Sequence, residues 1–163
     1  MFGIRTLADL HAFNERDRAR SMPYFGQENV AAAMKKGPLT SPAYRKALAH
    51  CRLKARREGI DATLATHRVD ALVMPTQGPA WMLDLINGDQ IGGFSATSPA
   101  AVAGYPHLTV PMGFVQGLPV GLSFTGPAWS EARLLAFGYA FEQTVQARRE
   151  PTFARSTLEL LGA

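Results

Sequence analysis

The stretch from Gly104 to Pro127, GYPHLTVPMGFVQGLPVGLSFTGP, decides the fold, because a Gly or Pro interrupts two apolar runs every few residues. With the period of two that a strand imposes, each run has one face of large apolar side chains and one face of small or polar ones. The runs meet at VQGL, where Gly117 can adopt a positive φ. The stretch therefore predicts an antiparallel hairpin over about residues 107–125.

The two faces of this hairpin predict different neighbours. The large face, which includes Leu108, Val110 and Phe124, is expected to pack on helices. The small face, which includes His107, Thr109 and Ser123, must meet a helix, a second sheet layer or a substrate cleft that comes close to the backbone. Pro111 has no N–H for the strand ladder, so we expect its strand to be unpaired or bulged there.

Helical periodicity and capping signals predict helices around the hairpin. Ser41 followed by Pro42 begins the longest helix, which Gly59 interrupts or weakens, and Ser130 is the expected N-cap of the last helix. The segment 77–98 has no clear period and predicts a long loop, which is uncommon in a compact domain unless it is functional or disordered. Helices are expected at 4–20, 28–35, 42–68, 98–104 and 131–149, and a short buried strand at 71–74.

The bulk properties are those of one globular domain, residues 1–163. Apolar residues make up 47% of the chain and charged residues 18%. No apolar run approaches the roughly 20 residues that cross a bilayer, and the N-terminus lacks the apolar core of a signal peptide. We therefore expect a cytoplasmic protein without a membrane partner.

The titratable residues give no metal or nucleic-acid signal. The net charge of +4 comes mostly from one helical stretch, 45–57, where basic residues occupy the expected solvated side. That stretch has no interleaved aromatic residues for base stacking, so we expect no nucleic-acid partner. The only cysteine, Cys51, is expected in the core, and no His and carboxylate spacing fits a metal site. We therefore predict no metal and no cofactor.

The hairpin and the helix after it resemble the C-terminal part of the amidase signature family. In that family a Gly-x-Pro turn leads to a strand ending in Pro-x-Gly, then to Gly-Leu-Pro-Val-Gly, Gly-Pro and a helix ending in Phe-Glu. Upstream, RTLADLHAFNE, PYFGQE and DALVMPT resemble the preceding segments in order, so the resemblance covers nearly the whole chain. The matching positions here are Gly104, Pro106, Pro111, Gly113, Gly117, Leu118, Pro119, Val120, Gly121, Gly126, Pro127, Phe141 and Glu142.

The resemblance implies an α/β fold. It implies a partial mixed sheet that contains the 107–125 hairpin packed against helices, as the C-terminal part of the amidase α/β/α fold. Family members mostly hydrolyse amides with a serine nucleophile, a second serine on a cis peptide bond and a lysine. Their serine-rich segment, of the Gly-Gly-Ser-Ser-Gly-Gly-Ser type, is not found in these 163 residues. We therefore name no catalytic residue in this chain.

Four residues are candidates for substrate binding. By family position the loop before the Gly-x-Pro turn is expected to line the acyl pocket, with Ser95, Thr97 and Ser98 as its polar groups; the alternative is a surface loop feeding a small helix. His107 lies on the small face of the hairpin near Ser123. It is either a cleft residue or base, or a structural histidine with its hydrogen bonds satisfied.

Two functions remain open from the sequence. The first is a C-terminal amidase fragment or domain that is inactive alone because it lacks the catalytic segment. The second is a non-catalytic interaction module that completes a partner chain's amidase site or simply self-associates. Half of a large sheet leaves an open edge and an uncovered apolar face, which drive association. The expected partner is therefore a second copy of this chain or the missing catalytic half.

Overall fold

The computed structural model describes residues 3–82, 84–90 and 93–153, which belong to two compact units, Met1–Ala47 and Leu48–Ala163. The boundary between the units falls inside helix α4, Pro42–Arg52. The expected single domain over 1–163 stays a prediction.

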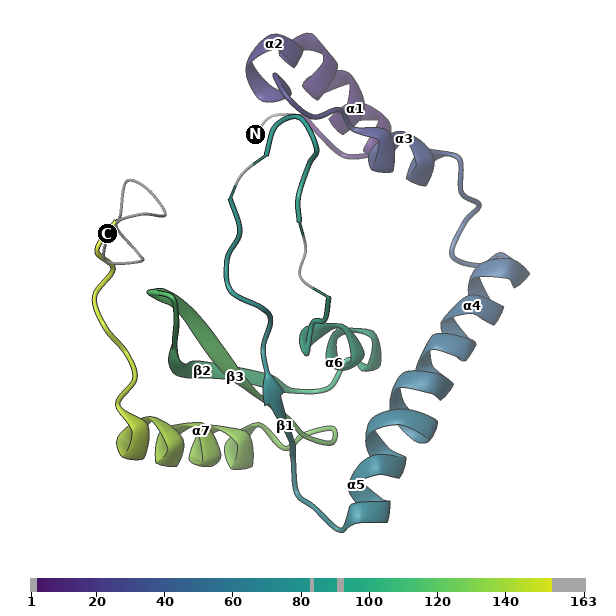
Figure 1. The fold of residues 1–163 in the computed structure, drawn as a ribbon. Coiled ribbons are helices and arrows are strands. Elements are labelled where there is room, and N and C mark those ends of the chain that lie inside the picture. The colour runs from purple at the N-terminus through teal and green to yellow at the C-terminus, as the bar shows by residue number, and fades with distance from the viewer. Residues whose placement is uncertain (1–2, 83, 91–92, 154–163) are drawn as a thin grey trace. The chain divides into compact units, whose positions relative to one another are not determined.

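The first unit contains helices α1 (Leu7–Arg16), α2 (Arg18–Ser21) and α3 (Glu28–Met34), which are the purple helices of Figure 1. A capping box begins α1, because the Thr6 hydroxyl accepts the Asp9 N–H while the Asp9 carboxylate accepts the Thr6 N–H. The single helix expected over 4–20 is instead two helices. The backbone leaves helical geometry at Asp17, where φ is −111°.

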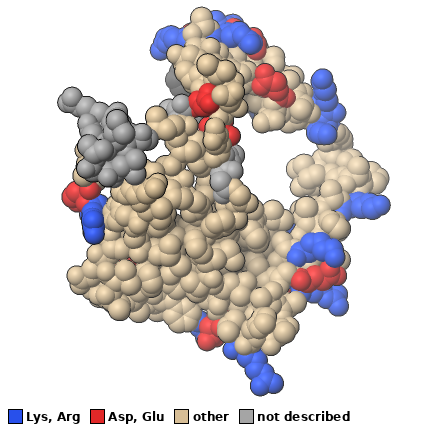
Figure 2. Space-filling view, in the orientation of Figure 1, with Lys and Arg blue, Asp and Glu red and all other residues tan. Residues whose placement is uncertain are grey.

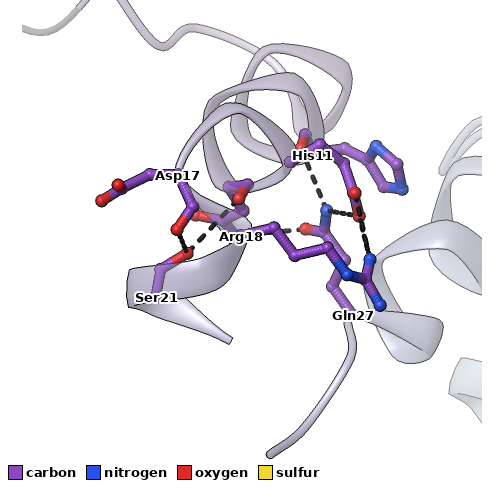
Figure 3. Close-up of polar contacts among 7 residues, drawn as sticks. His11, Asp17, Arg18, Ser21 and Gln27 are labelled. Carbon is purple, nitrogen blue, oxygen red and sulfur yellow. Dashed lines mark hydrogen bonds and ion pairs between the residues drawn. The ribbon is translucent and has the colours of Figure 1, made fainter. Parts of the chain in front are cut away.

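The side chain of Gln27 ties the segment before α3 to α1 (Figure 3). Its amide nitrogen donates to the His11 carbonyl at 3.0 Å and to the Glu15 carboxylate at 2.9 Å, while its oxygen accepts from Asn14 at 3.1 Å. These bonds use both donors and the acceptor of the amide. The Gln27 hydrogen bond, followed by that of Arg18, holds the pKa of Glu15 below its ordinary value.

The second unit is built on a three-stranded sheet with the order β1-β3-β2. Strands β2 (His107–Val115) and β3 (Leu118–Thr125) form the expected hairpin, and β1 (Leu72–Pro75) pairs with β3; both pairs are antiparallel. Gln116 and Gly117 both have positive φ at the turn, as a type I′ turn requires. The register shifts between Pro111 and Gly113, which confirms the bulge predicted from the missing proline N–H.

The large face of the hairpin packs on helix α7, Glu131–Val145, which runs below the sheet in Figure 1. Val110, Phe124 and Leu134 form the buried core, and the ring of Phe124 lies 6.2 Å from that of Phe141 in an edge-on arrangement. Gly138 lets the helix approach closely, because a Cβ there would clash with a Leu108 methyl group. The expected helical packing of this face is confirmed.

The ends of α7 differ in detail from the prediction. Ser130 occupies the N-cap position, but its hydroxyl donates to the Pro127 carbonyl at 2.7 Å rather than capping the helix. The helix was expected to run to Arg149, and it ends at Val145 because Gln146 adopts left-handed geometry. Arg149 instead places its guanidinium 4.9 Å from the centre of the Phe114 ring.

The remaining helices of this unit cover part of the opposite side of the sheet. The long helix that begins at Pro42 continues through a π-helical stretch, η1 (Leu53–Ile60), into α5 (Asp61–His67), and Gly59 lies in the π-helical part. Helix α6, Thr97–Ala103, packs on η1 around Ile60 and Leu64. Cys51 is exposed, so its expected place in the core was wrong.

Two polar contacts fix the Gly-x-Pro turn, Gly104–Pro106, against the long helix. Arg56 donates to the Ala103 carbonyl at 2.5 Å and lies over the Tyr105 ring, while the Tyr105 hydroxyl donates to the Asp61 carboxylate at 2.9 Å. The turn begins with Gly104 at φ 66°, which closes α6 as predicted. These contacts set where strand β2 starts.

Candidate functional site

Three hydroxyl groups meet on the small-residue face of the hairpin. Thr109 and Ser123 are directly opposed across β2 and β3, and Thr76 follows the end of β1 beside Gly121. Ser123 Oγ donates to Thr76 Oγ1 at 2.8 Å, and Thr76 Oγ1 lies 2.6 Å from Thr109 Oγ1. We call Thr76, Thr109 and Ser123 the hydroxyl cluster.

Gly121 makes the hydroxyl cluster possible. A Cβ on this residue would lie 2.7 Å from Thr109 Oγ1 and 2.8 Å from Thr76 Oγ1, closer than real Cβ contacts. The bare backbone at this position therefore leaves the space in which the two threonine hydroxyls meet. Gly121 is therefore bare because polar side chains from two neighbouring segments occupy the space where its Cβ would lie.

The cluster has one hydroxyl proton more than its internal hydrogen bonds use. Three hydroxyl groups carry three protons, and the two bonds consume two of them. Ser123 is 1% exposed and donates to Thr76, so the remaining proton belongs to Thr76 or Thr109. That proton has no further acceptor among the described residues. The cluster therefore offers one donor at its solvent side, where Thr109 is exposed.

A cavity of about 340 Å³ lies against this end of the cluster. It is lined by Pro119, Val120 and Gly121 of β3 and by residues at the start of the 77–98 loop, including Gln77 and Trp81. Thr76 and Thr109 both line it. None of the residues that line the cavity is charged.

The loop that walls the cavity is fastened to the end of β1. The Thr76 N–H donates to the Gly121 carbonyl at 2.7 Å, and the Thr76 carbonyl accepts the Ala96 N–H at 2.9 Å. Gln77 and Ser95 form an isolated antiparallel bridge. Both ends of the described part of the loop are therefore held beside the hydroxyl cluster by backbone hydrogen bonds.

The structure places the four predicted site residues in three different settings. Ser95 forms the bridge to Gln77, and its hydroxyl shares a 2.7 Å hydrogen bond with that of Thr97 at the start of α6. Ser98 is exposed on α6. It takes part in neither of the two hydrogen bonds that hold the hydroxyl cluster together. A binding role for Ser95, Thr97 and Ser98 stays a prediction.

His107 is separated from the other three. It pairs with Thr125 at the start of β2 and lines a small cavity of about 200 Å³ together with Glu131 and Leu134 of α7. Burial lowers the pKa of its imidazole, and its Nε2 is a buried atom without a hydrogen-bond partner among the described residues. Its predicted role in a substrate cleft stays a prediction.

The hydroxyl cluster can bind a ligand but lacks a group to activate a nucleophile. A serine or threonine hydroxyl attacks a carbonyl only when a neighbouring base takes its proton. Within the described part of the chain, every side-chain hydrogen bond of the cluster is to another hydroxyl. The lysines at 35, 36, 46 and 54 are all exposed, and Lys54 pairs with Glu58 at 2.6 Å. No group of three or more His, Cys, Asp or Glu in the described residues is placed to hold a metal.

Sequence reasoning missed Thr76, Gln77 and Trp81 as site residues. Thr76 follows the short strand LVMP directly, at the point where a strand end delivers its next side chain to a sheet edge. Alternation along the hairpin already placed Thr109 and Ser123 on the small face. What no pattern in the sequence indicated is the pairing of β1 with β3, which brings Thr76 to the other two hydroxyls.

A family model described as Amidase matches residues 6–135. The chain belongs to the amidase family. The match includes residues of both compact units and ends within α7. The family resemblance inferred from the hairpin motifs is confirmed.

Solved structures agree with this assignment. The native peptide amidase from Stenotrophomonas maltophilia is 48% identical, with a TM-score of 0.82, over 93% of this chain and 30% of that one. A peptide amidase in complex with the inhibitor chymostatin is 50% identical, with a TM-score of 0.86, over 93% of this chain and 31% of that one. The expected α/β fold, with a hairpin packed against helices in an amidase-type arrangement, is confirmed.

Two curated relatives are matched over a smaller share of their own length than the solved structures are. A putative amidase from Schizosaccharomyces pombe is 31% identical over 161 residues, which are 92% of this chain and 26% of that protein. A probable amidase from Arabidopsis thaliana is 29% identical over 155 residues, which are also 92% of this chain and 26% of that protein. The chain thus spans about a quarter of the length of these curated relatives.

Proposed function

We propose that residues 1–163 form the C-terminal part of an amide hydrolase and contribute to its substrate pocket, while another polypeptide segment supplies the nucleophile. The observation that carries this proposal is the combination of a ligand-sized cavity without charged lining residues and a hydroxyl cluster that no base contacts among the described residues. Family membership and the peptide amidase likeness support amide bonds as the target. By this proposal the 163 residues alone do not hydrolyse amides.

Complementation tests the proposal directly. The purified chain is mixed or co-expressed with a version of the Stenotrophomonas maltophilia peptide amidase that lacks the region matched here. We expect no release of ammonia from peptide amides by either part and measurable release by the pair. Pairing the truncated enzyme with a chain unfolded by a core substitution, Leu134→Asp, is the control.

The opposite result is equally clear. Hydrolysis by the chain alone that persists through repeated purification, and is lost in Ser98→Ala or His107→Ala, would place a nucleophile or base inside these 163 residues. The proposal would then be wrong. A pair that assembles, as judged by co-elution, but stays inactive would also contradict it.

A second proposal is self-association through the open side of the sheet. β1 lies at one edge, and its Val73 is 52% exposed. A groove of about 790 Å³ lies beside it, between β1 and the end of α7, with Phe137 and Phe141 among its mostly apolar walls. From the side drawn in Figure 2, the surface over α7 and the sheet carries few Lys, Arg, Asp or Glu side chains. Exposed apolar patches of this kind favour association.

Sedimentation velocity over micromolar concentrations tests self-association. We expect a dimer that Val73→Lys disrupts, because a lysine on the edge opposes strand pairing. The matched control is Thr66→Lys, which adds the same charge at an exposed position of α5. A monomer at all concentrations would refute self-association without bearing on complementation.

No helix among the described residues is long and apolar enough to cross a membrane.

A further inference from the structure

We propose that a cavity between η1, α6 and the sheet is a separate binding site, which takes a small neutral molecule with an apolar body and one hydroxyl group. Its volume is about 330 Å³, within the range of small-molecule sites. It shares no lining residue with the cavity beside the hydroxyl cluster. Binding here is therefore separate from the amide hydrolysis proposed above.

Three segments of the chain enclose the cavity with mostly apolar side chains. Ile60 of η1 and Ala96, which precedes α6, are each 3% exposed. Leu72 and Met74 contribute from β1. Ile60 is part of a buried core cluster, and Leu72 packs against it, so the cavity borders a packed core. An apolar ligand body is favoured in such a place because it leaves water.

The π-helical geometry of η1 shapes one wall of the cavity. Lys54 and Gly59 both line it, and a Cβ on Gly59 would clash with the backbone carbonyl oxygen of Lys54. A backbone atom cannot rotate away as a side chain does, so this wall requires a glycine. π-Helical turns are rare and occur frequently at functional sites. The wall therefore favours a binding role over a simple gap in the packing.

Thr125 supplies the polar recognition group. It lies at the end of β3, lines the cavity and is 7% exposed. Its hydroxyl has no hydrogen-bond partner among the described residues, whereas the hydroxyl of Ser123, two residues earlier, donates to Thr76. A hydroxyl that is removed from water without a partner costs free energy. A ligand hydroxyl can donate to this group or accept from it, and so recovers that cost.

The cavity offers no free charge to an ionic ligand. Lys54 alone is charged among the described lining residues, and its ammonium group lies 2.6 Å from the Glu58 carboxylate. An anion or a cation that entered the cavity would lose hydration without gaining a counter-ion of its own. The walls therefore select a neutral ligand.

NMR titration of the whole chain with three probes of one size tests the proposal. Phenol has the ring and the hydroxyl, toluene has the ring alone, and benzoate is the anion at pH 7. We expect phenol to shift the backbone amides of Gly59, Ala96 and Thr125. The amide of Ala140, which lines the apolar groove beside α7, is the internal control and should not move. Benzoate should bind more weakly than phenol by about fivefold or more.

Substitutions of Thr125 locate the hydrogen bond. Thr125→Val keeps the shape and removes the hydroxyl, so it should weaken phenol binding about fivefold, the effect of one hydrogen bond. The same change should leave toluene binding equal or tighter. Thr125→Ser should restore phenol binding to within about twofold because it returns the hydroxyl. Thr144→Val, which removes a hydroxyl bonded to the Ala140 carbonyl on α7, is the matched control and should bind phenol as the unaltered chain does.

Filling the cavity provides an independent test. Ala55 lines it from η1, so Ala55→Leu should abolish the phenol shifts at Thr125. Ala49→Leu adds the same side chain at an exposed position of α4 and should leave binding unchanged.

Several results would overturn the proposal. They are benzoate binding as tight as that of phenol, phenol shifts that map to Ala140 and the groove, no shift with phenol, or unchanged phenol affinity in Thr125→Val. If Thr125→Val does not fold, the shift map of the unaltered chain and the binding of Ala55→Leu decide. Complementation of the truncated peptide amidase has no bearing on these outcomes, so this site and the proposed function fail or succeed separately.

Discussion

Replacing Gly121 by alanine tests the packing that creates the hydroxyl cluster. The new Cβ would lie 2.7 Å from Thr109 Oγ1 and 2.8 Å from Thr76 Oγ1. Overpacking a filled site costs about 1–3 kcal/mol, and displacing one hydroxyl hydrogen bond costs about 1 kcal/mol more. Against this, alanine is favoured over glycine inside a strand by about 0.5–1 kcal/mol. The balance predicts that Gly121→Ala destabilises the chain by about 2 kcal/mol.

A double-mutant cycle with Thr109→Ala separates this clash from other effects. Thr109→Ala removes one of the two hydroxyls that the new methyl group meets, so part of the overpacking should disappear. The double variant should therefore be more stable than the sum of the two single changes by about 1 kcal/mol. The measurement is urea unfolding followed by circular dichroism, with the free energy of unfolding extrapolated to water.

Gly37→Ala is the control for the glycine replacement itself. The added Cβ would meet only Ser41 atoms at 3.7 and 3.8 Å, which is ordinary contact. Its effect should be neutral or stabilising by up to about 1 kcal/mol, through the unfolded chain. The clash is refuted as a destabilising force if Gly121→Ala leaves the free energy of unfolding unchanged or raises it. It is also refuted if the cycle is additive to within about 0.5 kcal/mol.

Three further predictions concern the frame around the site. Leu134→Ala, at a position 2% exposed, should lower the free energy of unfolding by about 2–5 kcal/mol in urea titrations, and a loss below about 1 kcal/mol would contradict a core centred on this side chain. Tyr105→Phe removes the 2.9 Å bond to Asp61 and should cost about 1–2 kcal/mol in the same assay, whereas an unchanged midpoint would show that the bond contributes nothing. Burial lowers the pKa of His107, so the unfolded chain takes up its proton first; stability should be full above about pH 6.5 and fall as the pH drops through and below that value. Urea midpoints between pH 8 and pH 5 should show this decline in the unaltered chain, and an equal decline in His107→Gln would exclude His107 as its source.

The helices show how far local patterns reach. The helix begun by Pro42 and the closure of α6 by Gly104 follow from local backbone preferences, so the sequence predicted them. The break at Asp17 and the end of α7 at Val145 were missed, because a helical period continues across both positions. Cys51 was misplaced for a related reason. Helical spacing identifies an apolar stripe but not whether another element covers it.

The amino-acid sequence by itself determined the hairpin, its bulge beside Pro111, its two unlike faces and the family. Each structural feature among these depends on neighbouring residues: the turn at Gln116 and Gly117 sets the register, and a proline without an N–H interrupts the ladder. Only the tertiary structure decided where the hydroxyl cluster forms and that His107 lies in a separate cavity beside α7. Thr76 meets Thr109 and Ser123 because β1 pairs with β3 across about 50 residues of sequence, a choice fixed by packing over the whole sheet rather than by any local pattern.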